Sequence, residues 1–114
     1  MTKISTHVLD TGRGTPAAGV AVVLEMAKPG GAWVELGRGV TDADGRIASL
    51  FPEGAILTAG DYRLRFATGD YFRNSGLAVF YPEVIVQARL DPTVGKYHLP
   101  LLLSPFWYST YRGS

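Results

Sequence analysis

The stretch DYRLRFAT, residues 61–68, alternates apolar with charged side chains over most of its length. Tyr62, Leu64 and Phe66 take every second position, and arginines stand between them. Successive side chains of a β-strand point to opposite faces, so a period of two is typical of a strand with one face buried. The stretch therefore predicts a strand that lays its apolar face on a core and its arginines in water.

Short runs rich in Val, Ile, Leu, Phe and Tyr lie on both sides of this strand, between glycines and prolines that are spread along the whole chain. Such spacing predicts many short strands joined by turns. Further strands are expected at residues 4–9, 20–26, 33–40, 46–50, 84–90, 97–103 and 107–111. Residues 69–74 lack the period of two and fit one helical turn opened by Asp70. Eight strands and one short helix indicate an all-β protein, a Greek-key β-sandwich of two sheets.

The sequence TDADGR, residues 41–46, contains an Asp-Gly pair directly ahead of Arg46. Glycine accepts a positive φ and aspartate can hydrogen-bond its own backbone, so this dipeptide favours a tight turn. The turn should reverse the chain into the strand expected at residues 46–50. Arg46 would enter that strand, where an arginine taken alone is most simply a solvated surface residue.

The chain of 114 residues has the usual size of one domain, and no linker is evident in its composition. We therefore expect a single domain over residues 1–114. The 11 basic and 10 acidic residues are interspersed and leave a net charge of +1, which gives no reason to expect nucleic acid or an anionic membrane as partner. No apolar run has the length of a membrane span or a signal peptide, so the expected location is the cytoplasm, unless a leader has been removed.

The run LPLLLSPFW, residues 99–107, is apolar at positions that would face both sides of its strand. An outer sheet of a sandwich normally leaves one face polar. A large exposed apolar surface usually marks an interface, so we expect a second copy of the chain to cover this one. A loop of the same chain folded over the strand is the alternative.

The chain has only two histidines, His7 and His98, and each falls inside an expected strand. Histidine is the side chain whose ordinary pKa suits proton transfer at neutral pH, and a strand would hold the imidazole in a fixed direction. From composition alone, a hydrogen-bonded structural histidine is the more common role for such a residue. The two histidines are therefore candidates for acid-base chemistry that need further support.

Other kinds of site find less support in the sequence. A zinc site needs three or four convergent ligands, and with no cysteine and no His-x-His or His-Glu-x-x-His spacing the chain offers no such set. Ser5, Ser104 and Ser109 lack the Gly-x-Ser-x-Gly surroundings of a serine nucleophile, and phosphate-binding or dinucleotide motifs are absent. We expect neither a metal nor a cofactor.

Six motifs together resemble the transthyretin-like 5-hydroxyisourate hydrolases. They are HVLD at residues 7–10, TDADGR at 41–46, GDYRL at 60–64, FYPEV at 80–84, YHLPLLLSP at 97–105 and YSTYRGS at 108–114. The resemblance runs from about Ile4 to the last residue. Its most specific element is YRGS at residues 111–114, which ends the chain in that family and is absent from the transthyretin hormone carriers.

The resemblance implies a transthyretin-like sandwich with a catalytic trio and three substrate-binding residues near the end of the chain. The trio is His7, Arg46 and His98, and the binding residues are Tyr111, Arg112 and Ser114. The alternative role for Arg112 is to anchor the end of the chain by pairing with an acidic residue of a neighbouring subunit. The hormone carriers have Lys, Glu and Thr in place of the trio. This chain departs from the family at Lys96, where a histidine is common, and that leaves any accessory role of the position open.

The family also implies a homotetramer, a dimer of dimers, with active sites in a channel at the dimer-dimer interface and no metal or cofactor. The implied reaction is hydrolytic opening of the ring of 5-hydroxyisourate at an amide carbonyl, which gives 2-oxo-4-hydroxy-4-carboxy-5-ureidoimidazoline. His7 or His98 would act as general base on water, and Arg46 would stabilise the oxyanion or hold a histidine. A small-molecule carrier like transthyretin and a structural sandwich module are the alternatives.

Overall fold

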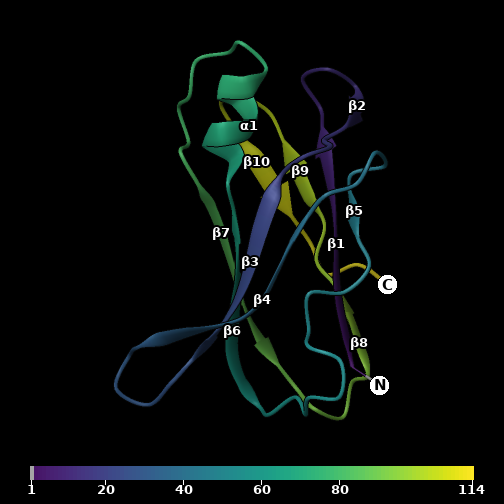
Figure 1. Ribbon diagram of the computed structural model, residues 1–114, viewed down its shortest axis with the longest axis vertical. Helices are drawn as coiled ribbons and strands as arrows, with labels where there is room; N and C mark the ends of the chain where they lie inside the picture. The colour runs from purple at the N-terminus through teal and green to yellow at the C-terminus, as the bar shows by residue number, and fades with distance from the viewer. Residues whose placement is uncertain (1) are drawn as a thin grey trace.

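The computed structural model describes residues 2–114 as two facing β-sheets with one short helix at one end (Figure 1). The six-stranded sheet contains β1 (Lys3–Asp10), β2 (Thr15–Pro16), β5 (Arg46–Ile47), β8 (Lys96–His98), β9 (Leu101–Leu103) and β10 (Tyr108–Thr110). The four-stranded sheet contains β4 (Trp33–Val40), β3 (Ala21–Ala27), β6 (Gly60–Phe66) and β7 (Val84–Leu90) in that order. The helix α1 (Thr68–Asn74) follows β6. The expected all-β class and two-sheet arrangement are confirmed.

Strand β1 is the centre of the six-stranded sheet. Its first half lies between antiparallel β5 and parallel β8, and its second half lies between antiparallel β2 and parallel β9. The single strand predicted at residues 97–103 is divided into β8 and β9. One register nevertheless runs through both pieces, because His98 lies opposite Ser5 and Leu101 lies opposite Val8. The break contains Pro100, whose ring nitrogen has no hydrogen to donate to a neighbouring strand.

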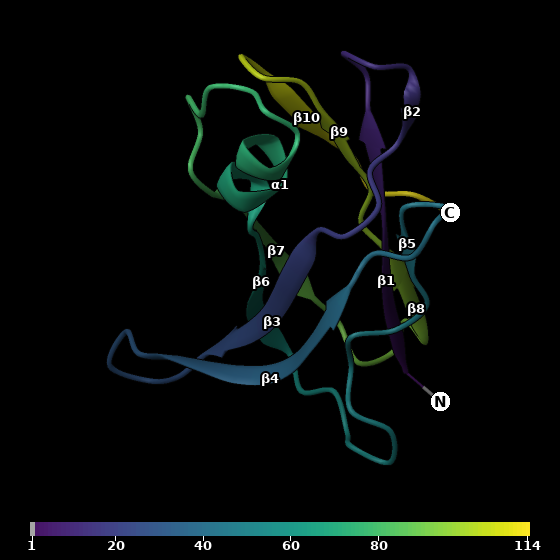
Figure 2. The same ribbon diagram turned by 45° about the horizontal axis from the view of Figure 1, so that its top comes forward.

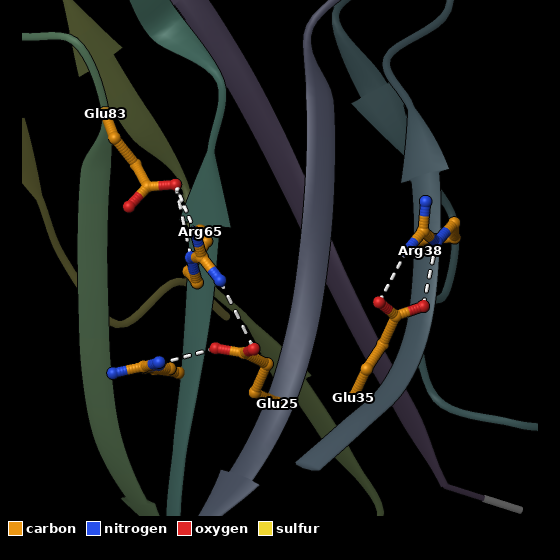
Figure 3. Close-up of polar contacts among 6 residues, drawn as sticks. Glu25, Glu35, Arg38, Arg65 and Glu83 are labelled. Atoms are coloured by element: carbon orange, nitrogen blue, oxygen red, sulfur yellow. Dashed lines mark hydrogen bonds and ion pairs between the residues drawn. The ribbon is translucent and has the colours of Figure 1, made fainter. Parts of the chain in front are cut away.

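Strand β6 carries the alternating part of the stretch, and its two faces lie as the pattern predicts. The strand predicted at residues 61–68 ends at Phe66, since Thr68 already belongs to α1. Tyr62, Leu64 and Phe66 are buried in the core between the sheets. The arginines lie on the other face, where Arg63 pairs with Glu25 at 2.6 Å and Arg65 pairs with Glu83 at 2.9 Å. Figure 3 shows Arg65 reaching both acidic side chains, Glu25 on β3 and Glu83 directly ahead of β7. This outer face is therefore a network of paired charges.

Several predictions about short elements need correction. The two-residue strand β2 was not expected, and the strand predicted at residues 46–50 is a strand only at Arg46 and Ile47. Beyond it, the amide of Leu50 still donates to the carbonyl of Ile4 on β1 at 2.8 Å. The helix begins at Thr68, so Asp70 lies within its first turn and does not open it. Ala67 precedes the first turn and supplies no side-chain cap. Packing of the apolar face of the helix replaces the cap as the source of its stability.

A buried polar contact ties α1 to β1. The hydroxyl of Tyr71 donates to a carboxylate oxygen of Asp10 at 2.7 Å, and Asp10 is 2% exposed. Burial, followed by this hydrogen bond to Asp10, raises the pKa of Tyr71 to about 12. The helix is thus fixed across the end of both sheets, away from the first half of β1. Over residues 2–114 the structure has no helix long and apolar enough to cross a membrane.

Candidate active site

The two predicted histidines and Arg46 meet on the face of the six-stranded sheet that points away from the core. Along β1, half-buried Ser5 and His7 alternate with the buried Ile4, Thr6 and Val8, so Ser5 and His7 share this outer face. Across the sheet, His7 lies opposite Arg46 on β5, and Ser5 lies opposite His98 on β8. The three strands therefore bring together residues that are separated by about ninety positions in the chain.

The turn before β5 fixes Arg46 against β1. A carboxylate oxygen of Asp42 accepts hydrogen bonds from the amides of Asp44 and Arg46, each at 2.9 Å. Gly45 has a φ of +76°, and its carbonyl accepts a hydrogen bond from the amide of Val8 at 2.7 Å. A Cβ atom at position 45 would lie 2.3 Å from the carbonyl oxygen of Val8, so only glycine fits this close approach. The predicted Asp-Gly turn is confirmed.

The same turn orients His7. Its Nε2 lies 2.9 Å from the backbone carbonyl oxygen of Asp44. A carbonyl only accepts hydrogen bonds, so Nε2 is the nitrogen that carries a proton and donates. In the neutral imidazole this leaves Nδ1 of His7 as the free acceptor.

His98 is held on the opposite side of β1. Its Nδ1 lies 2.8 Å from the hydroxyl oxygen of Ser5. Burial lowers the pKa of His98 from its ordinary value, and the positive charges of Arg46 and His7 lower the pKa further. A lowered pKa favours the uncharged imidazole, which is the form that can accept a proton.

The end of the chain continues beside β8. The register that pairs Thr110 with Leu101 also pairs Gly113 with His98, and the amide of Gly113 donates to the carbonyl of His98 at 2.8 Å. This register places Tyr111 opposite Pro100, in the same row across the sheet as His7. Figure 2 shows the C-terminus beside β1 and β5.

A cavity of about 390 Å³ opens on this face. Its lining consists of Lys3, Ser5, Thr6, Asp42, Arg46, Ile47, Ala48, Lys96, His98 and Ser114. Arg46 and the two lysines give the cavity an excess of positive charge, with Asp42 as the acidic member. The volume suits a ligand of the size of a substituted purine.

The sequence-predicted residues fall into two groups. Arg46, His98 and Ser114 line the cavity, whereas His7, Tyr111 and Arg112 lie outside its lining. The guanidinium of Arg112 lies over the ring of Tyr97, with 5.2 Å between Cζ and the ring centroid.

Sequence reasoning did not identify Ser5 or Lys3 as cavity residues, and it left the role of Lys96 open. A signal for two of them was available, because Lys3 and Ser5 precede His7 at steps of two along one strand and so share its face. The partner strand β8 could not be found in this way, since its parallel pairing with β1 depends on contacts across the whole chain.

The grouping permits acid-base chemistry on a small polar molecule. A neutral imidazole can accept a proton from water, and the cationic side chains can stabilise negative charge that develops on an oxygen. In the part of the chain from residue 2 onward, no three His, Asp or Glu side chains are grouped as metal ligands would be. The fold and the site together define a transthyretin-like β-sandwich with ionisable side chains on one open sheet face.

Comparison with known proteins gives the family. The model of the HIUase/Transthyretin family matches residues 4–113, and the chain belongs to that family. The chain is 51% identical over 111 residues to the 5-hydroxyisourate hydrolase of Salmonella typhimurium, covering 97% of this chain and 80% of that protein.

Two solved structures show how widely the fold is shared. The 5-hydroxyisourate hydrolase of Klebsiella pneumoniae superposes with a TM-score of 0.85 and is 38% identical, covering 100% of both chains. Sea bream transthyretin in complex with thyroxine superposes with a TM-score of 0.90 and is 37% identical, covering 97% of this chain and 94% of that one. Backbone similarity alone therefore does not separate a hydrolase from a thyroxine-binding protein, and the side chains of the site must do so.

Proposed function

We propose that the protein is a 5-hydroxyisourate hydrolase of urate degradation. The observation that carries the proposal is that the partly buried His98 and Arg46 line one cavity large enough for a purine-like ring, where burial lowers the pKa of His98. Relatives with that name are about half identical to this chain over nearly its whole length, which supports the same activity.

The proposed reaction starts with a water molecule between His98 and the substrate. Nε2 of His98 takes a proton from the water while the oxygen attacks the ring carbonyl, and the negative charge that develops on the carbonyl oxygen is stabilised by Arg46. Collapse of the tetrahedral intermediate breaks the carbon–nitrogen bond, and the proton on His98 passes to the departing nitrogen. The product is the ring-opened carboxylate, 2-oxo-4-hydroxy-4-carboxy-5-ureidoimidazoline.

The remaining proposed site residues hold Arg46 or the substrate in position. His7, held by the Asp44 carbonyl, supports the position of Arg46 across the β1–β5 pair. Ser114 lines the cavity and offers a hydroxyl to the substrate, and Tyr111 offers an aromatic face beside it. The placement of Arg112 over Tyr97 favours an anchoring role for Arg112 over direct contact with the carboxylate that forms in the product.

A direct test follows the decay of freshly generated 5-hydroxyisourate with and without the purified chain, after correction for its spontaneous decay. The proposal expects a decay rate that rises in proportion to the concentration of the chain. The competing function is a carrier that binds its ligand without turnover, so thyroxine binding is measured in parallel. Tight thyroxine binding without any acceleration of the decay would favour the carrier.

We also propose that the chain assembles as a homotetramer, a dimer of dimers with active sites at the dimer-dimer interface. Within the apolar run at residues 99–107, Leu99, Leu101 and Leu103 are buried in the chain's own core. Phe106 stays 69% exposed and Trp107 49% exposed. An apolar surface of this kind supports an interface.

Light scattering coupled to gel filtration tests the assembly, and a stable monomer at micromolar concentration would contradict it. The single-domain organisation and the cytoplasmic location stay predictions. One cooperative unfolding transition would support the first, and fractionation of the source cells tests the second.

A further inference from the structure

His98 sits between two small residues, Ser5 on β1 and Gly113 near the end of the chain. On one side, Nδ1 of His98 lies 2.8 Å from Oγ of Ser5, which also lies 3.3 Å from the carbonyl oxygen of Tyr97. On the other side is Gly113, whose amide is bonded to the His98 carbonyl. The ring therefore has a polar contact toward β1 and a residue without a side chain toward the end of the chain.

The contacts of Ser5 decide which nitrogen of His98 carries the proton. A serine hydroxyl has one hydrogen, and the Tyr97 carbonyl can only accept. Both contacts are hydrogen bonds at once only when the hydroxyl donates to the Tyr97 carbonyl and accepts from Nδ1–H of His98. The proton then lies on Nδ1, and the lone pair of Nε2 is free.

Gly113 leaves the space that the imidazole occupies. A Cβ atom at this position would lie 2.5 Å from Cδ2 of His98, which is closer than real Cβ contacts come. The backbone of Gly113 is outside the left-handed region, so its conformation does not require glycine. The ring of His98 is thus the reason that only glycine fits here.

We propose that Ser5 and Gly113 are positioning residues for His98, in which Ser5 holds the tautomer with a free Nε2 and Gly113 holds the ring orientation. A general base must present a lone pair to water, and the opposite tautomer would present an N–H. The catalytic consequence rests on the proposed hydrolase function. The tautomer and the ring position do not, and they are measured without substrate.

The first test is ¹⁵N NMR of the ring nitrogens in the full chain at a pH where His98 is neutral. The chain has two histidines, so four ring nitrogens are observed and single substitutions assign them. We expect the proton of His98 on Nδ1 in the native chain, a shift toward Nε2–H in Ser5→Ala, and the native tautomer in Ser5→Thr, which keeps a hydroxyl. A native chain with Nε2–H, or a Ser5→Ala tautomer equal to the native one, would overturn the role of Ser5.

The second test compares two glycine substitutions. Gly113→Ala should shift the ¹⁵N and ring-proton signals of His98 and lower kcat with little change in KM. Gly95→Ala is the matched control, because a Cβ atom at Gly95 meets no other atom and its backbone is outside the left-handed region. Unchanged His98 signals in Gly113→Ala, or equal changes in both variants, would overturn the role of Gly113.

Measurement of kcat then tests whether the tautomer and orientation of His98 affect turnover. Loss of a residue that orients a functional imidazole typically costs about 10- to 100-fold, and we expect a loss of this scale in kcat for Ser5→Ala, with recovery in Ser5→Thr. A Ser5→Ala enzyme with native kcat would refute the catalytic importance of the tautomer. If the native chain shows no hydrolase activity, the proposed function fails, while the NMR result for the tautomer still stands or falls by itself.

Discussion

Replacing Gly45 with alanine should damage both the stability and the activity of the protein. Gly45 has a φ of +76°, and an alanine there would place its Cβ 2.3 Å from the Val8 carbonyl oxygen, a backbone atom of β1. The left-handed conformation costs a residue with a side chain about 1–2 kcal/mol. Shifting the turn away from β1 also weakens the hydrogen bond from Val8 to Gly45, worth about 1 kcal/mol.

A suitable control separates the two costs. Gly14 has a similar φ of +72°, but a Cβ atom there meets nothing within 4 Å. Gly14→Ala should therefore lose only the conformational part, about 1–2 kcal/mol, and Gly45→Ala about 2–3 kcal/mol. For a domain of this size, each kcal/mol corresponds to roughly 4 °C in Tm, so the two variants should differ by about 4 °C.

Thermal denaturation at one fixed protein concentration measures the difference, because assembly makes Tm depend on concentration. The turn also carries Arg46 and the carbonyl that orients His7, so the hydrolase rate should fall in Gly45→Ala and stay near native in Gly14→Ala. Equal melting temperatures for the two variants, with equal activity, would refute the claim that this turn holds the site against β1.

Three further predictions concern catalysis directly. Turnover should fall by about a hundredfold or more in each of the variants His7→Ala, Arg46→Ala and His98→Ala. Circular dichroism should show that each variant stays folded. Inactivity caused by unfolding would favour purely structural roles. Burial and the charges of Arg46 and His7 lower the pKa of His98, so kcat/KM should stay level at neutral pH and fall on acidification only through a pKa below 6.5. Arg46→Ala removes one of these charges and should move the acidic fall of the pH profile to higher pH. Arg46→Lys keeps the charge and should leave the fall in place. Deletion after Thr110 should leave a folded chain with collapsed kcat/KM, since misplacement by about an ångström can cost a hundredfold, and native kinetics in the truncated chain would exclude a role for the terminal residues.

Much of the fold could be predicted from side-chain periodicity. The alternation around Leu64 sets one face of β6 on the core, and the turn at residues 41–46 depends on local chemistry that the sequence displays. Short elements were less predictable, because the extent of β5 and the break at Pro100 depend on which neighbours the strand meets. The start of α1 was misplaced at Asp70, since packing and not a capping side chain decides where this helix begins.

The site was less accessible to reasoning from residues alone. His7 and His98 could be recognised as candidates, but their selection together with Arg46 came from resemblance to a family. The register that sets Ser5 opposite His98 joins segments about ninety residues apart and cannot be read from either strand. For the same reason, the contact between Gly113 and the His98 ring had no local signal, although it explains a glycine in the terminal motif.

The most direct test of the central claim compares the native chain with His98→Gln in the decay of freshly generated 5-hydroxyisourate. Glutamine keeps a polar side chain but cannot act as a base near neutral pH. We expect the native chain to accelerate the decay. At the same concentration and with the same Tm, His98→Gln should lower the catalysed part of the rate, after correction for spontaneous decay, by about a hundredfold or more. Equal rates for the two proteins, or a native chain that leaves the spontaneous rate unchanged, would contradict the account.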